Sequence, residues 1–174
     1  MTRLVNDLLT LTRFESGTAP HRQRLRLDAF LNQALDELSL RQHGVVEARD
    51  IRPGLTVEAD PEALKRVVVN LAENALKYAP GAEQRWSVFS VDGRAAIRLE
   101  DAGPGISRQD LPHIFERFYR GDKARDRSAG GSGLGLAIAK SIVEVHSGSI
   151  EAQSEPGKGA TFTAWLPLAA EATA

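Results

Sequence analysis

Residues 60–78 read DPEALKRVVVNLAENALKY and predict a long amphipathic helix. Asp60 followed by Pro61 is a typical helix start, because the carboxylate caps free N–H groups and proline fits the first helical position. The sequence Pro80-Gly81 ends the helix. The apolar side chains recur at helical spacing and predict one buried side, made of Leu64, Val67, Val68, Leu71, Ala75 and Leu76.

A polar stripe lies beside that buried side. Asn70, Asn74 and Lys77 follow one another at i, i+4 and i+7, which places them within an arc of roughly 60°. Glu73 is next to the stripe. Such residues are common on a solvated helix surface. They also suit a second interpretation, in which an amide oxygen binds a hard cation and the lysine supplies a positive charge to phosphates.

The next segment contains a possible hairpin and a glycine turn. Strands are predicted over 84–91 and 94–101, and Asp92-Gly93 between them favours a tight turn. Asp101-Ala102-Gly103-Pro104-Gly105 ends the second strand. A carboxylate there can accept a hydrogen bond from an exocyclic amine such as that of adenine. The glycines allow the backbone to approach a base closely.

A second glycine segment, Gly130–Leu136 with the sequence GGSGLGL, precedes a helix predicted near 133–146. Free N–H groups at a helix start, together with the helix dipole, attract anions. The segment is neither a Walker A loop nor a dinucleotide fingerprint. Before it, Phe115 and Phe118 are expected to anchor the chain in the core. The guanidinium of Arg120 is a candidate for a terminal phosphate.

The other predicted elements complete an α+β chain. Non-alternating strands and helices favour an α/β sandwich, in which helices cover one face of a mixed β-sheet. The elements are helices over 1–16 and 27–42, and strands over 45–51, 55–59, 149–154 and 160–166.

The first helix has two interpretations. Leu4, Leu8 and Leu11 form an apolar stripe, and a helix of this length is marginal without a partner. It either folds back onto the domain or is the end of a longer helix from a bundle. The polar run from Ser16 to Arg24 favours a linker after it.

Composition excludes several classes of protein. The 174 residues are 42% hydrophobic and 26% charged, with a net charge of −1, so the surface as a whole is not basic enough to favour nucleic acid or anionic lipid. The absence of cysteine excludes disulfides and thiol nucleophiles. No apolar run reaches the roughly 18 residues of a membrane span.

Taken together, the motifs closely resemble the ATP-binding catalytic domain of bacterial sensor histidine kinases, in the Bergerat superfamily. They are NLAENALKYA, DAGPGI, IFERFYR, GGSGLGL and GKGATFTAWLP, in that order. The resemblance implies a mixed sheet covered on one face by three helices over 27–168. Residues 1–16 resemble the end of a dimerization and phosphoacceptor helix, 17–26 a linker and 169–174 a tail.

The resemblance also implies a site for ATP and Mg²⁺. Asn74 is then the metal ligand, Lys77 and Arg120 contact phosphate, and Asp101 binds the adenine amine. Asn70, Lys77 and Arg120 are the expected catalytic residues. The expected ATP-binding residues are Asn70, Asn74, Lys77, Tyr78, Asp101, Gly103, Gly105, Ile106, Arg120, Gly131, Ser132, Gly133, Leu134, Gly135 and Leu136.

One position distinguishes related activities. Superfamily hydrolases have a glutamate four residues before the metal asparagine, whereas this chain has Asn70, which cannot act as a carboxylate base. Phosphoryl transfer to a protein is therefore favoured over hydrolysis, and the resemblance implies that the acceptor is a histidine. The alternatives are an ATPase of the superfamily, a serine kinase that controls a sigma factor, and a non-catalytic nucleotide-binding module.

The phosphoacceptor is expected outside this chain. The family's acceptor histidine is followed by an acidic residue, whereas the four histidines here precede Arg22, Gly44, Ile114 and Ser147. His146 is expected to carry a favourable charge at a helix end. The implied partners are a histidine-bearing domain of the same protein and a response regulator, without nucleic acid. A homodimer is expected only for the parent protein. The chain is expected in the cytoplasm, with the parent anchored in a membrane.

Overall fold

The central sheet is mixed and has five strands. The computed structural model describes residues 2–15, 19–41, 47–121 and 132–170. The strand order is β2-β4-β5-β7-β6, and every pair is antiparallel except β2 with β4. The strands are β2 (Glu47–Ile51), β4 (Gln84–Val91), β5 (Arg94–Asp101), β6 (Ser149–Ser154) and β7 (Ala160–Pro167).

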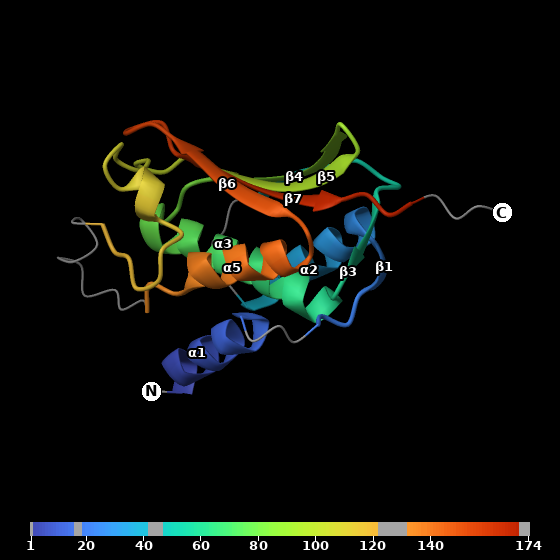
Figure 1. The fold of residues 1–174 in the computed structure, drawn as a ribbon. Coiled ribbons are helices and arrows are strands. Elements are labelled where there is room, and N and C mark those ends of the chain that lie inside the picture. The colour runs from blue at the N-terminus through green and yellow to red at the C-terminus, as the bar shows by residue number, and fades with distance from the viewer. Residues whose placement is uncertain (1, 16–18, 42–46, 122–131, 171–174) are drawn as a thin grey trace.

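Three helices cover one face of this sheet, namely α2 (Leu27–Arg41), α3 (Pro61–Tyr78) and α5 (Gly135–Val145). Figure 1 shows the sheet above and the helices below it. The expected α+β sandwich is therefore confirmed. Burying these apolar faces against one another supplies most of the driving force for folding. The largest fully buried side chains of this core include Trp86, Phe162, Leu31, Leu64, Leu71 and Ile142.

The predicted local signals are present. Asp60 caps α3 by accepting hydrogen bonds from the backbone N–H groups of Glu62 and Ala63, at 3.1 and 3.2 Å. Asp92 and Gly93 join β4 to β5 with φ of 49° and 76°. Both residues have the positive φ that a two-residue hairpin turn requires at its two central positions.

One strand was not expected. β1 (Gln23–Arg26) lies within the segment expected as a linker and pairs antiparallel with β3 (Thr56–Ala59). β2 and β3, which flank the turn at Pro53-Gly54, belong to different sheets. β1 contains a single apolar side chain, Leu25, so no alternation marked it as a strand. A short 3-10 helix, Leu111–His113, was also not predicted.

Helix α1 (Thr2–Glu15) lies below the helix layer, on the side away from the sheet (Figure 1). It packs against α5, and Leu11 is only 2% exposed. Leu4, Val5, Leu8 and Leu9 stay exposed. The structure thus shows α1 docked on this chain, while its continuation into a longer helix stays a prediction. No helix in the described ranges is both long and apolar enough to span a bilayer.

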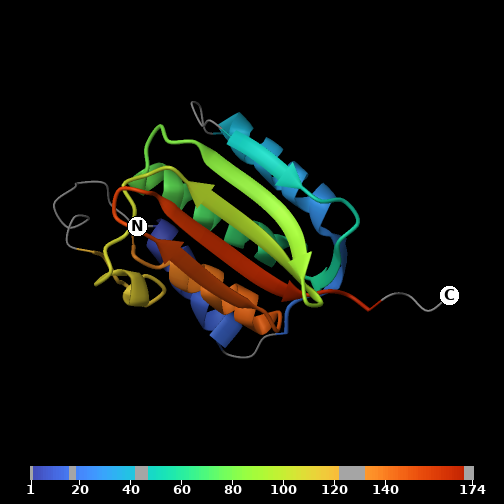
Figure 2. The same cartoon turned by 90° about the horizontal axis from the view of Figure 1, so that it is seen from above.

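The opposite face of the sheet carries an aromatic and cationic cluster. Figure 2 views this uncovered face from above. Phe89 and Trp165 meet edge to face with ring centroids 5.6 Å apart. Arg98 lies over Phe89 and Arg94 over Trp165, at 4.5 and 4.9 Å from the ring centroids. These stacked side chains shield the sheet from water where no helix covers it.

Candidate functional site

Helices α3 and α5 run antiparallel, with the start of α5 beside the middle of α3. A Cβ atom added to Gly135 would lie 3.6 Å from Oδ1 of Asn70. At the other end, the backbone N–H of Asp60 donates to Nε2 of His146 at 3.0 Å. α5 therefore covers the N-terminal half of α3. The part of α3 from Asn70 to Tyr78 extends beyond the start of α5, and this is the part that carries the predicted polar stripe.

The polar stripe is partly accessible. Asn74 and Lys77 are half-buried, and Tyr78 is exposed. Nζ of Lys77 lies 4.8 Å from the centroid of the Tyr78 ring. Within the described part of the chain, Nδ2 of Asn70 is buried without a hydrogen-bond partner. A buried amide donor without a partner is costly in a folded protein, so its place beside the start of α5 favours a role in binding.

The first glycine turn packs on the end of α3. The backbone N–H of Gly103 donates to Oδ1 of Asp101 at 2.9 Å. A Cβ atom on Gly103 would overlap the side chain of Ala79, which follows α3. Burial raises the pKa of the Asp101 carboxyl above its usual value, against the opposing effect of N–H groups from Gly103 and Ala160. This carboxylate is therefore fixed at the C-terminal end of the polar stripe.

A support behind that turn was not predicted. The backbone N–H of Ile106 donates to Oγ of Ser154 at 2.8 Å, and that hydroxyl donates to the carbonyl of Gly159 at 2.6 Å. Gly105 has φ of 71°, and a Cβ atom there would overlap the carbonyl oxygen of Glu155. The loop between β6 and β7 thus fixes the turn. The glycine-rich GKGATF segment was the only sequence signal for this contact.

The second glycine segment is held at Phe118. The N–H of Phe118 donates to the carbonyl of Gly133 at 3.0 Å, and both residues have positive φ, 61° and 70°. The expectation that Phe118 anchors the core is wrong, because this backbone conformation leaves its side chain 58% exposed. Phe115 does pack against the core, as expected.

Residues around the start of α5 have different environments. The side chain of Leu134 is fully buried in the core, so only its backbone is available to a ligand. Oγ of Ser132 accepts a hydrogen bond from the N–H of Leu134 at 3.3 Å. Gly133, Gly135 and Leu136 are half-buried. Gly131, which was also expected in the site, lies outside the described residues.

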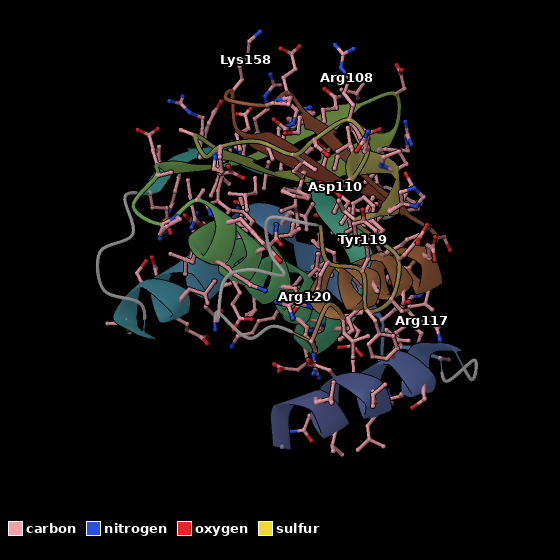
Figure 3. The ribbon with its side chains drawn as sticks, turned by 90° about the vertical axis from the view of Figure 1, so that its left-hand side faces the viewer. Arg108, Asp110, Arg117, Tyr119, Arg120 and Lys158 are labelled. Atoms are coloured by element: carbon pink, nitrogen blue, oxygen red, sulfur yellow. The ribbon has the colours of Figure 1, made fainter. Side chains whose placement is uncertain are left out.

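A hydrogen-bonded group precedes Arg120. Tyr119 and Ser107 donate to the two carboxylate oxygens of Asp110, each at 2.7 Å. Figure 3 shows Asp110 and Tyr119 next to each other, with Arg120 nearer to the helices. Arg120 itself is half-buried and its Nε is shielded from solvent. The Asp110 group fixes the backbone that carries Arg120. No spacing in the sequence indicated it.

His146 does not carry the expected charge. Its side chain is 1% exposed, its Nδ1 lies 2.7 Å from the carbonyl of Ile142, and its Nε2 accepts from Asp60. Nδ1 therefore holds the single proton of a neutral ring. Burial, aided by the nearby charge of Arg22, lowers the pKa of His146. It joins the two helix ends far from the polar stripe.

The site therefore offers hydrogen-bond donors and positive charges to an anion such as a phosphate. It also offers a hydrogen-bond acceptor, the Asp101 carboxylate, to a nucleobase. The first N–H groups of α5 lack partners within the helix and favour negative charge. Lys77 and Arg120 supply positive charge. The described residues contain no cluster of three or more His, Cys, Asp or Glu side chains that could hold a metal alone. A hard cation bound by Asn74 would therefore need further oxygen ligands from the anion and from water.

Comparisons with known proteins agree with this geometry. The family described as histidine kinase-, DNA gyrase B- and HSP90-like ATPases matches residues 59–170. The sensor histidine kinase WalK of Bacillus subtilis is 41% identical over 98% of this chain, which spans 29% of that relative. Full-length ShkA, solved in complex with AMPPNP, superposes with a TM-score of 0.83 at 29% identity, over 98% of this chain and 36% of ShkA. The mycobacterial kinase MprB gives 0.74 at 30% identity, over 84% of this chain and 98% of the MprB chain. The chain therefore belongs to the histidine kinase-, DNA gyrase B- and HSP90-like ATPase family, as an ATP-binding catalytic domain of the sensor histidine kinase type.

Proposed function

We propose that this domain binds Mg-ATP along the C-terminal half of α3 and passes the γ-phosphoryl group to a histidine on a helical bundle. The observation that carries the proposal is the position of Gly135 beside Asn70, with Gly103 packed on Ala79. This arrangement puts two glycine segments, far apart in the sequence, at the two ends of one polar stripe. The similar protein ShkA was solved with an ATP analogue, which supports the proposal that this domain binds ATP.

Each residue has a role that its position supports. Asp101 accepts a hydrogen bond from the adenine amine, and Gly103, Gly105 and Ile106 let the backbone approach the base. The N–H groups at Gly133 and Gly135, together with Lys77, bind the phosphates. The further ATP contacts are assigned to Tyr78, Leu136, the backbone of Leu134 and the Ser132 hydroxyl.

Transfer of a phosphoryl group depends mainly on positioning and neutralisation of charge. In the proposed site Asn74 holds Mg²⁺, which would neutralise charge on the phosphate oxygens when bound. Arg120 is directed to the terminal phosphate by the backbone that Asp110 and Tyr119 fix. Asn70 cannot remove a proton from water, which favours a protein acceptor over hydrolysis.

The acceptor and downstream partner are proposed from the family. The chain spans less than a third of its WalK relative. We propose a histidine-bearing domain of the same protein as acceptor and a response regulator as the next recipient. We also propose that the ATP-binding unit covers 27–168, with 1–16 belonging to the acceptor-bearing helices.

Two measurements test this function. Isothermal titration should show ATP binding that weakens when Mg²⁺ is removed. Incubation with radioactive ATP and a separate histidine-bearing bundle should label the bundle. Steady ATP hydrolysis without a bundle would favour an ATPase, and binding without labelling would favour a non-catalytic module. Absence of ATP binding would contradict the proposal.

A further inference from the structure

Helix α1 contacts the glycine segment through one carboxylate, Asp7. Its Oδ2 accepts a hydrogen bond from the hydroxyl of Ser132 at 3.2 Å. Its Oδ1 lies 3.3 Å from a terminal guanidinium nitrogen of Arg66 on α3. The Asp7 side chain is only 14% exposed. Three elements distant in the sequence therefore meet at this carboxylate.

Ser132 is part of the predicted phosphate-binding segment. It precedes α5 by three residues, and its oxygen accepts from the N–H of Leu134 at 3.3 Å. A serine hydroxyl has one proton to donate. While that proton points to Asp7, it is not available to a phosphate oxygen.

The charge of Asp7 acts in the same direction. A carboxylate near the start of a helix takes the place of the anion that the helix dipole favours, and it repels phosphate. Arg66 offsets part of this charge. Asp7 contacts the Ser132 hydroxyl and Arg66 contacts Asp7, so the two charged residues are expected to change nucleotide affinity in opposite directions.

We propose that Asp7 is a negative regulator of nucleotide binding, which competes with the phosphates of ATP for the Ser132 hydroxyl while α1 is docked. This inference rests on the proposed function, since it concerns the same site. It adds a residue outside the ATP-binding unit that sets the affinity. In this arrangement a change in the position of α1 alters ATP binding directly, without any movement of α3.

Titration of the full chain with Mg-ATP tests the proposal. Asp7→Ala should raise the affinity by about threefold or more, since it frees the hydroxyl and removes a charge. The gain should shrink at high salt, because salt screens the repulsive part. Asn6→Ala, at the exposed neighbouring position of α1, is the matched control and should leave the affinity unchanged.

Two more variants separate competition from a structural role. Arg66→Ala should weaken ATP binding, the opposite sign to Asp7→Ala. In a Ser132→Ala background, Asp7→Ala should give a smaller gain, because no hydroxyl remains to be freed. Circular dichroism and thermal unfolding of each variant establish that the fold is kept.

Unchanged or weaker ATP binding in Asp7→Ala, with binding intact in the original chain, overturns this inference and leaves the proposed function standing. Equal gains with and without the Ser132 hydroxyl also overturn the competition. Binding by Asp7→Ala alone supports both proposals, and binding by neither variant nor the original chain overturns both.

Discussion

At the scale of single residues, the site depends on which oxygen or hydrogen each side chain presents. Asn70 offers an amide at the position where a hydrolase of the superfamily is expected to have a carboxylate base, and Asn74 offers an amide oxygen to the proposed metal ion. Gly103 and Gly105 are required because larger residues would overlap Ala79 and Glu155. Such constraints are local, so substitutions with matched controls can test them singly.

Asn74→Ala should reduce the affinity for ATP in the presence of Mg²⁺ by about tenfold or more, since a ligand to a charged group is lost. The fold should persist because Asn74 is only half-buried. Calorimetric titration with and without Mg²⁺ measures both values. Glu62→Gln, on the exposed first turn of the same helix, should bind ATP as before; an unchanged affinity in Asn74→Ala would remove the metal assignment.

Gly105→Ala should destabilise the domain more than Gly157→Ala does. Both glycines have positive φ, 71° and 83°, and share a cost of roughly 1–2 kcal/mol for a left-handed residue. Only Gly105 adds an overlap with a backbone carbonyl, while nothing lies within 4 Å of a Cβ at Gly157. Urea unfolding gives the two free energies. Equal losses would show that the loop at Glu155 adapts at no cost.

At the scale of elements, the antiparallel pairing of α3 and α5 positions the site. His146 and Asp60 close one end of the pair, and Asn70 and Gly135 meet near its middle. The segment before β1 is attached at the closed end. The backbone N–H of His21 donates to the Asp60 carboxylate, and the guanidinium of Arg22 donates to the backbone carbonyl of Val145. The closed end therefore lies opposite the end of the helix pair where we propose that ATP binds.

This closed end predicts a pH dependence of stability. The pKa of His146 is lowered in the folded state from 6.5, so the unfolded chain binds the proton more readily. The stabilising contribution is complete above pH 6.5 and is lost as the pH falls below that value toward the folded pKa. Arg22 and Asp60 are the charged groups that face the ring.

Urea unfolding of His146→Gln between pH 5 and 8 checks this expectation. Glutamine retains an acceptor for Asp60 and a donor for Ile142 but does not titrate. The free energy of unfolding of the variant should therefore fall less steeply below pH 6.5. The same slope in both proteins would show that another group causes the dependence.

At the scale of the whole molecule, α1 forms a third layer, which is attached through the Asp7 carboxylate and through the buried side chain of Leu11. Leu11→Ala should loosen this layer, because a helix of α1's length is marginal without tertiary contacts. Leu9→Ala, at a side chain that is 62% exposed, is the matched control and should change little. Hydrogen exchange should show faster exchange in α1 of Leu11→Ala and unchanged protection in β4 and β5. Loss of protection throughout would mean that α1 and the sheet unfold together.

Much of this fold was predictable because its signals are local. The Asp60-Pro61 cap, the Asp92-Gly93 turn and the apolar stripe of α3 each lie within a few residues. β1 and the pairing of β3 were not predictable from the sequence, since Gln23–Arg26 shows no alternation and its paired residues lie 30 to 36 positions further along the chain. The exposure of Phe118 also depends on a backbone bond to a distant residue, Gly133.

The site divides in the same way. Asn70, Asn74, Lys77 and Asp101 could be proposed from the sequence because their motifs are continuous in it. Asp7 and Asp110 were not, because only the folded chain brings them to Ser132 and Tyr119. Local patterns thus indicate which groups could meet a ligand, whereas the groups that restrain them emerge from packing.

The two tryptophans lie in different environments, so tryptophan fluorescence can follow the folding of this chain. Trp86 is sealed in the interior, whereas Trp165 sits beneath Arg94 on the uncovered side of the sheet. Acrylamide should therefore quench the fluorescence of Trp165 more strongly than that of Trp86. Replacing Trp165 by phenylalanine would leave Trp86 as the single tryptophan, and its emission should shift to longer wavelength when the interior unfolds.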